Sequence, residues 1–171
     1  MDRYFAHSKE GQGQPPERLQ PLEEHLKCVA ELARQFAEPF GGEEWAYWAG
    51  LWHDLGKYSK EFQRYLLQES SEDFHEAEIR GKVDHTSAGA QYATKMIPVF
   101  GHILAYAVSG HHAGLLDGIS ENACLNKRLR KKVSPYENGL KHLPPFNVLK
   151  HPNFLDEAFK GKRTEAAFRF S

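Results

Sequence analysis

The sequence predicts an all-α protein, a bundle of helices packed around one hydrophobic core. Apolar residues recur at three- and four-residue spacings in several segments, glycines and prolines separate these segments, and no stretch shows the clear alternation of a strand. A chain of 171 residues with 40% hydrophobic residues can form one compact domain with a real core and is short for two. We therefore expect a single domain over residues 1–171.

The first two helices have the strongest patterns. Segment 21–38 begins at Pro21, which suits a first helical turn. Its predicted apolar face comprises Leu22, Leu26, Val29, Ala33 and Phe36. A second helix is expected from Glu43, with its end marked by Gly56 and with His53 and Asp54 in its last turn. Its tryptophans follow helical spacing and are predicted to be core residues: Trp45, Trp48 and Trp52.

Three further helices are expected before a less regular C-terminal third. Segment 59–68 has Ser59 as a capping residue, segment 85–97 is stopped by Pro98, and segment 99–111 ends at paired histidines. Residues 117–152 are rich in Gly, Asn and Pro and are expected to be irregular. A last helix is expected over residues 153–170.

Charge and cysteine content exclude several classes of protein. The formal net charge of −1 favours neither a membrane surface nor a general polyanion binder, although residues 1–123 carry −8 and residues 124–171 carry +7. Cys28 and Cys124 have no CxxC spacing, and Cys28 lies in a helical pattern where a buried free thiol is usual. Because the chain also has no apolar leader and no membrane-length apolar run, we expect a soluble cytoplasmic protein.

Ten histidines among 171 residues stand out, because imidazole is the commonest transition-metal ligand. Five of them and one aspartate lie near predicted helix ends or on apolar helices: His25, His53, Asp54, His85, His111 and His112. Such ligands favour Mn²⁺, Fe²⁺, Co²⁺, Ni²⁺ or Zn²⁺, with Mg²⁺ as a further candidate. One carboxylate can bridge two cations, which lower the pKa of a bridging water and stabilise charge on an attacked phosphate. The cluster predicts phosphodiester hydrolysis with one or two divalent metal ions.

Each of these signals also has a purely structural interpretation. A histidine such as His25 on an apolar helix is more often a core residue with one satisfied hydrogen bond than a ligand. It is the combination of HDLGK at 53–57, DH at 84–85 and HH at 111–112 that favours a metal site. Lys57 is either a surface residue or a cation that faces phosphate.

Three motifs carry a resemblance to a known family: AGLWHDLGK at 49–57, VDHTSAGA at 83–90 and SGHHAGLLDG at 109–118. Together they resemble the HD nuclease domain of the type I CRISPR-associated helicase-nuclease, a branch of the HD phosphohydrolase superfamily. FAHS at 5–8 and PLEEHL at 21–26 are similar to its N-terminal pattern. The resemblance covers most of the chain, and the ordered set of motifs is more specific than HD alone.

The resemblance implies an HD-domain helical bundle whose metal site lies between central helices. It also implies cleavage of single-stranded DNA displaced by a guide-RNA surveillance complex, together with a helicase, in antiviral defence. His25, His53 and Asp54 would serve one metal, and Asp54 would bridge to a second metal held by His85, His111 and His112. The implied catalytic residues are Asp54 and Lys57, with Lys57 supporting the site or contacting phosphate.

One departure from the family pattern concerns a further metal-binding aspartate, expected in a segment after a final helix. Asp117 and Asp156 come too early for it, and the chain ends at AAFRFS. We therefore expect an HD nuclease domain truncated at the C-terminus and lacking the fused helicase, with the first metal position incompletely liganded.

The segment NKRLRKK at 126–132 is a candidate for nucleic-acid contact, because clustered positive charge binds phosphate. The candidate residues are Lys127, Arg128, Arg130, Lys131 and Lys132. The alternatives are a solvated charged surface and a surface that packs on the helicase. Tyr136 and Phe146 are interpreted as packing residues rather than base-stacking ones, and His7 as a structural or rim residue.

Two other functions stay open at this point. A nucleotide phosphohydrolase of the HD type would need a closed pocket for base and sugar and would gain nothing from the basic segment. A non-catalytic interaction domain would keep the metal only as a structural staple.

Overall fold

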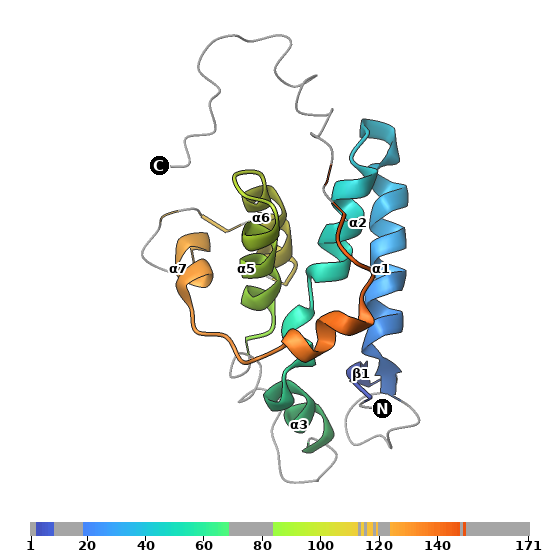
Figure 1. Cartoon of the computed structure of the whole chain (residues 1–171), viewed down its shortest axis with the longest axis vertical. Helices are drawn as coiled ribbons and strands as arrows, with labels where there is room; N and C mark the ends of the chain where they lie inside the picture. Colours follow the sequence, from blue (N-terminus) through green and yellow to red (C-terminus); the bar gives the residue numbers. More distant parts are fainter. Residues whose placement is uncertain are drawn as a thin grey trace.

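The computed structural model describes residues 3–8, 19–68, 84–112, 114, 116–117, 119, 124–147 and 149. This part of the chain is mainly helical, as predicted (Figure 1). Its α-helices are α1 Leu22–Ala37, α2 Glu43–Trp52, α3 Lys60–Gln68, α5 Thr86–Met96, α6 Gly101–Gly110 and α7 Leu125–Arg130. Short 3₁₀ helices cover η2 Glu38–Phe40, η3 Leu55–Tyr58 and η4 Glu137–His142, and two strands cover β1 Phe5–Ser8 and β2 Leu19–Pro21.

Helices α1 and α2 pack closely because small residues lie where they meet. A Cβ atom at Gly50 would lie 2.5 Å from the Cα atom of Ala30, so only glycine permits this approach. The buried row on α1 is therefore Leu22, Leu26, Ala30 and Ala37. The predicted placement of Phe36 on the inner face is wrong, since its side chain is 77% exposed, and Cys28 is exposed rather than buried.

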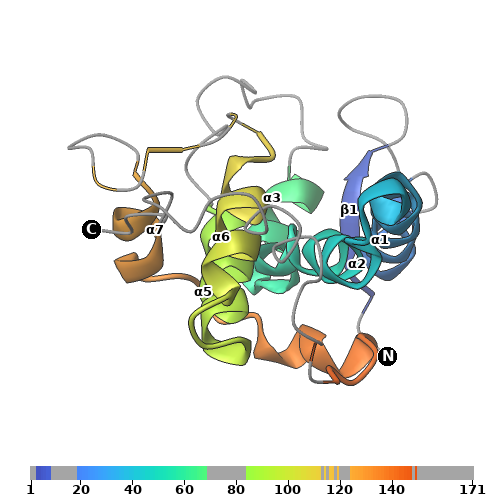
Figure 2. The ribbon, with the colours of Figure 1, turned by 90° about the horizontal axis from the view of Figure 1, so that it is seen from above.

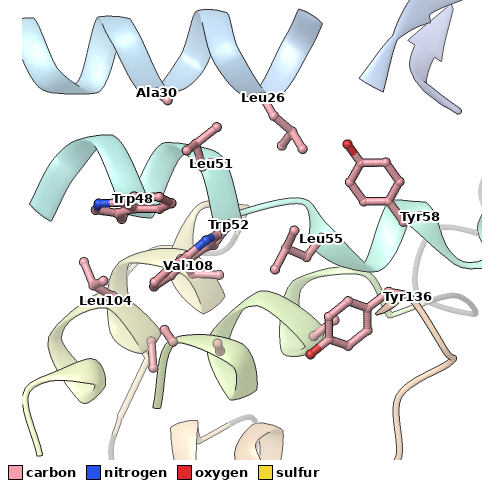
Figure 3. Close-up of a cluster of buried hydrophobic side chains, with 14 of the residues drawn as sticks. Leu26, Ala30, Trp48, Leu51, Trp52, Leu55, Tyr58, Leu104, Val108 and Tyr136 are labelled. Atoms are coloured by element: carbon pink, nitrogen blue, oxygen red, sulfur yellow. The ribbon is translucent and has the colours of Figure 1, made fainter. Parts of the chain in front are cut away.

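Helix α2 lies between α1 on one side and the pair α5 and α6 on the other, as both views show (Figures 1 and 2). Leu51 points toward Leu26 and Ala30 of α1, whereas Trp52 lies against Val108 of α6 (Figure 3). The three tryptophans of α2 are 1% to 8% exposed, which confirms that they are core residues. Full burial of a large apolar side chain contributes roughly 1.5–3 kcal/mol to stability. Because α2 buries three tryptophans and packs on both sides, it is the central element of the core.

A two-stranded antiparallel sheet was not predicted from the sequence. Strands β1 and β2 pair Phe5 with Pro21 and Ser8 with Leu19, with an irregularity between Phe5 and His7. The buried amide of Gln63 on α3 accepts a hydrogen bond from the Phe5 nitrogen and donates to the Phe5 and Lys57 carbonyls, at 2.7–2.9 Å. One side chain thus joins α3 to β1 and to η3.

Most of the predicted helix boundaries are confirmed to within two residues. Ser59 caps α3, since its hydroxyl accepts a hydrogen bond from the Phe62 nitrogen at 3.2 Å. His53 and Asp54 fall just past the end of α2 rather than inside its last turn, because η3 begins at Leu55. The helix expected from Val99 begins at Gly101, and Val99 itself has φ of +70°.

The C-terminal part of the described chain crosses the bundle from α7 to α1 through η4 (Figure 1). Tyr136 is buried and makes an edge-on contact with Tyr92, and Phe146 packs on Trp48 and Trp52. Both are therefore packing residues, as predicted. The helix predicted over residues 153–170 lies outside the described residues.

No helix in the described ranges is both long enough and apolar enough to cross a membrane.

Tyr136 predicts a specific alkaline response. Burial, with smaller contributions from Glu137 and Tyr92, raises the pKa of Tyr136 to about 12. An unfolded tyrosine ionises near pH 10, so the stability that Tyr136 contributes is complete below about pH 10 and is lost as pH rises toward 12. The unfolding free energy from urea denaturation should fall less steeply with pH between these values in Tyr136→Phe than in the wild type. The difference in slope should correspond to at most one proton. Identical slopes for both proteins would contradict this.

Candidate metal centre

Every predicted metal ligand and Lys57 are brought to one place by the ends of four helices. His25 lies in α1, His53 follows α2, and His85 immediately precedes α5. His111 and His112 follow α6. The central carboxylate, that of Asp54, lies between α2 and η3 and is only 2% exposed.

The two carboxylate oxygens of Asp54 face different imidazoles. Oδ2 lies 3.1 Å from Nε2 of His53 and 3.4 Å from Nε2 of His25. Oδ1 lies 3.4 Å from Nε2 of His111 and 3.6 Å from Nε2 of His85. Asp54 therefore stands between two sets of nitrogen ligands, which is the arrangement that a bridging carboxylate needs.

Two groups among the described residues have ligand atoms close enough to hold a metal ion, and both contain Asp54. One group is His25, His53 and Asp54, and the other is Asp54, His85, His111 and His112. These are the two sets that the family resemblance implies. Asp117 belongs to neither group, and its carboxylate instead accepts a hydrogen bond from the Ile119 nitrogen at 2.8 Å. Asp156 lies outside the described residues.

Backbone hydrogen bonds fix the orientation of two imidazoles. Nδ1 of His53 lies 2.7 Å from the Gly50 carbonyl, and Nδ1 of His111 lies 2.6 Å from the Val108 carbonyl. A carbonyl only accepts, so Nδ1 carries the proton in each ring and a neutral ring has its lone pair on Nε2. Both Nε2 atoms face Asp54, which is the orientation that metal-binding histidines require.

A family model for the HD domain matches residues 22–137 of this chain. The chain belongs to the HD domain family. No curated protein matches it. Membership indicates metal-dependent phosphohydrolase activity. The matched range contains every residue of the two groups.

The residues of this HD domain fit a divalent transition metal. Oδ1 of Asp54 is buried and has no hydrogen-bond partner among the described residues, which is costly unless a cation satisfies it. Imidazole nitrogens also approach each other closely, at 3.2 Å for His25 and His53 and 3.0 Å for His85 and His112. Nitrogen pairs that converge beside a buried carboxylate suit a cation between them.

The charge states of Asp54 and His112 favour metal binding near neutral pH. Burial alone would raise the pKa of Asp54, but His111, His25 and His53 outweigh it and hold the pKa well below the usual range. Partial desolvation and the neighbouring His111 lower the pKa of His112, so its imidazole keeps a free lone pair. A charged carboxylate and a neutral imidazole are the ligand forms that a metal needs.

Lys57 is part of the site rather than a surface residue. Its ammonium lies 2.8 Å from Oδ2 of Asp54, and its side chain is 10% exposed. Removing the partner of a buried ammonium is strongly destabilising, so Lys57 and Asp54 act as one unit in the site. Outside the two groups, the ring of His7 contacts His25 edge-on, with centroids 5.3 Å apart, consistent with a rim position.

The sequence patterns did not reveal the supporting roles of two residues near the ligands, Gly56 and Asp84; that of Asp84 is described below. A Cβ atom on Gly56 would lie 2.5 Å from the Cα atom of His85, and the Gly56 nitrogen donates to the His85 carbonyl at 3.2 Å. Gly56 therefore sets the spacing between η3 and the start of α5. Its place in HDLGK suggested only a helix end, because contacts across 29 residues leave no local signal.

Proposed function

We propose that this HD domain is a metal-dependent nuclease that hydrolyses phosphodiester bonds in single-stranded DNA. In this proposal it acts with a helicase, fused or separate, and with a guide-RNA surveillance complex in CRISPR interference. Its location would then be the cytoplasm.

The observation that carries the proposal is the division of the Asp54 oxygens between two sets of imidazoles. Two divalent cations, when bound at such a centre, activate a water for attack on phosphorus and stabilise the developing negative charge. Asp54 would bridge the two positions, and His25, His53, His85, His111 and His112 would complete them. Lys57 holds a positive charge beside Asp54, where it orients the carboxylate and offsets its charge.

Exposure at one side of the centre supports a polymeric substrate. His111 and His112 are exposed residues, whereas Asp54 is buried. A ligand set that opens to the surface can receive a phosphate from the middle of a strand, whereas a nucleotide enzyme encloses base and sugar. The choice of single-stranded DNA and the CRISPR partners rests on the resemblance of the three motifs.

The basic segment offers a surface for the strand. Lys127, Arg130 and Lys132 are exposed on or next to α7. We propose that these three contact phosphates and that binding is largely independent of sequence, since phosphate contacts carry no base information. The other two predicted phosphate contacts, Arg128 and Lys131, bond to Thr86 of α5 and to Asp84 just before it, and these partners favour a different role that is argued below.

A panel of substrates tests the proposed function. The protein is incubated with labelled single-stranded DNA, duplex DNA and single-stranded RNA in Mn²⁺, Ni²⁺, Mg²⁺ or chelator. We expect cleavage of single-stranded DNA in Mn²⁺ or Ni²⁺, little cleavage of duplex DNA, and none in chelator. Mononucleotides are included as a fourth substrate class.

The other outcomes separate the alternatives. Hydrolysis of mononucleotides without cleavage of any polymer would replace the nuclease by an HD nucleotide phosphohydrolase. Metal binding that raises the melting temperature, with no hydrolysis of any substrate, would indicate a metal-stapled interaction domain.

A further inference from the structure

Hydrogen bonds and an ion pair join α7 to the start of α5, directly beside the candidate ligand His85. The two helices lie next to each other in both views (Figures 1 and 2). Arg128 donates a hydrogen bond to the Thr86 hydroxyl at 2.6 Å, and Lys131 pairs with the Asp84 carboxylate at 2.8 Å. In return, the Gln91 amide donates to the carbonyls of Arg128 and Lys131 at 2.9 and 2.7 Å.

Asp84 organises the first turn of α5. Its Oδ1 accepts from the backbone nitrogens of Thr86 and Ser87 at 3.1 and 3.0 Å, and its Oδ2 accepts from the Ser87 hydroxyl at 2.7 Å. These nitrogens would otherwise lack partners at the helix start. The Asp84 side chain is 14% exposed, and the Lys131 ammonium is the cation that balances its charge.

His85 lies between these two anchored residues. Its predecessor Asp84 is paired with Lys131 and its successor Thr86 is bonded to Arg128. Its own carbonyl accepts a hydrogen bond from Gly56. The backbone of His85 is thus held from the α7 side and the η3 side at once, while its imidazole faces Asp54 and His112.

We propose that Lys131 and Arg128 are positioning residues for His85 and act through Asp84 and Thr86, rather than as contacts for the nucleic-acid substrate. The basic segment is then divided by role. Lys131 and Arg128 hold the α5 end of the metal centre, and Lys127, Arg130 and Lys132 face the strand. The inference deepens the proposed function and depends on it for the metal.

The test compares Lys131→Met with Lys132→Met, which remove the same charge from neighbouring exposed positions. Metal binding is measured by titration calorimetry with Mn²⁺, and cleavage of single-stranded DNA gives kcat and KM. Lys131→Met should lower the affinity for the metal ion on the His85 side of Asp54 roughly 10-fold and should lower kcat. The reason is that residues that orient ligands affect metal affinity by about 10–100-fold. Its KM and the salt dependence of KM should stay at wild-type values.

Lys132→Met should behave in the opposite way, with unchanged metal affinity, a raised KM and a weaker salt dependence. Lys131→Arg keeps the cation, so its metal affinity should equal that of the wild type and exceed that of Lys131→Met. A half-exposed ion pair adds little to stability, so all of these variants should melt like the wild type. A raised KM with unchanged metal affinity in Lys131→Met would make Lys131 a phosphate contact and overturn the proposal.

A readout without metal or substrate separates this inference from the proposed function. In the metal-free protein, the side-chain nitrogen resonances of His85 should shift in Lys131→Met and stay in place in Lys132→Met. Equal His85 spectra in the wild type and both variants would overturn the positioning role even if the nuclease is active. Shifted His85 spectra in a protein that cleaves no nucleic acid would support positioning and reject only the nuclease.

Discussion

Asp54→Ala is expected to abolish metal binding at both positions and to lower metal-dependent hydrolysis by about 1,000-fold or more. Its two oxygens face the two imidazole groups, so a single substitution removes a ligand from each. Titration with Mn²⁺ should show no saturable binding, and cleavage should fall to the level seen with chelator. Cleavage above about one hundredth of the wild-type rate would contradict a shared carboxylate.

The same substitution should also destabilise the protein, which calls for a matched control. Removing Asp54 leaves the buried Lys57 without its partner, and breaking a buried pair in this way costs roughly 3–5 kcal/mol. The double variant Asp54→Ala with Lys57→Met removes both charges and should recover most of that loss in urea denaturation. It should still bind no metal and show no hydrolysis, which separates a lost ligand from a lost fold.

Gly56→Ala should give the second large effect, because the added methyl group has no room. The new Cβ atom would lie 2.5 Å from both the Cα atom and the carbonyl oxygen of His85, closer than such atoms pack. Moving η3 away from α5 would separate Asp54 from His85. We expect a loss of about 1–3 kcal/mol in unfolding free energy from overpacking, together with metal affinity lowered by about 10-fold or more.

Gly101→Ala provides the control for Gly56→Ala. A Cβ atom at Gly101 would collide with the main-chain carbonyl of Ala93, where α6 begins against α5, with no metal ligand involved. It should destabilise the protein to a similar degree and leave the metal affinity of the folded fraction unchanged. Equal losses of metal affinity in both variants would show that the effect of Gly56 is general destabilisation.

The sequence predicted the helices well because their signals are local. Apolar spacing, Pro21, Ser59 and Pro98 each act within a turn of their own position, and the observed helices begin or end near them. The strands were missed for the complementary reason. Residues 5–8 and 19–21 are too short to show alternation, and their pairing depends on a partner more than ten residues away.

The exposed position of Phe36 shows how packing can override a helical pattern. Several apolar rows on α1 could have faced inward, and the close approach of Ala30 to Gly50 selects the row that contains Ala30. Periodicity alone cannot distinguish these rows, because the choice depends on the helix that packs against α1.

The ligand set of the centre followed from histidine placement and family resemblance, whereas its supports did not. Nothing near Asp84 in the sequence indicates Lys131, and nothing near Thr86 indicates Arg128, since these pairs are more than 40 residues apart. A run of positive charge suggested one role for all of its members. The fold brings Arg128 to Thr86 and Lys131 to Asp84 at the start of α5, and these contacts are the basis for proposing separate roles within the run.

The ligands lie at helix ends, and this has a consequence for local motion. Helix ends usually exchange their amide hydrogens fastest, through small openings that leave the rest of the fold intact. Ions held by His53 on one side of Asp54 and by His85 and His111 on the other would together join the end of α2, the start of α5 and the end of α6. Any fraying that carried one imidazole away would then have to break a bond to an ion. Hydrogen exchange would be slowest at these helix ends, the reverse of the order expected for a helical bundle without such a centre.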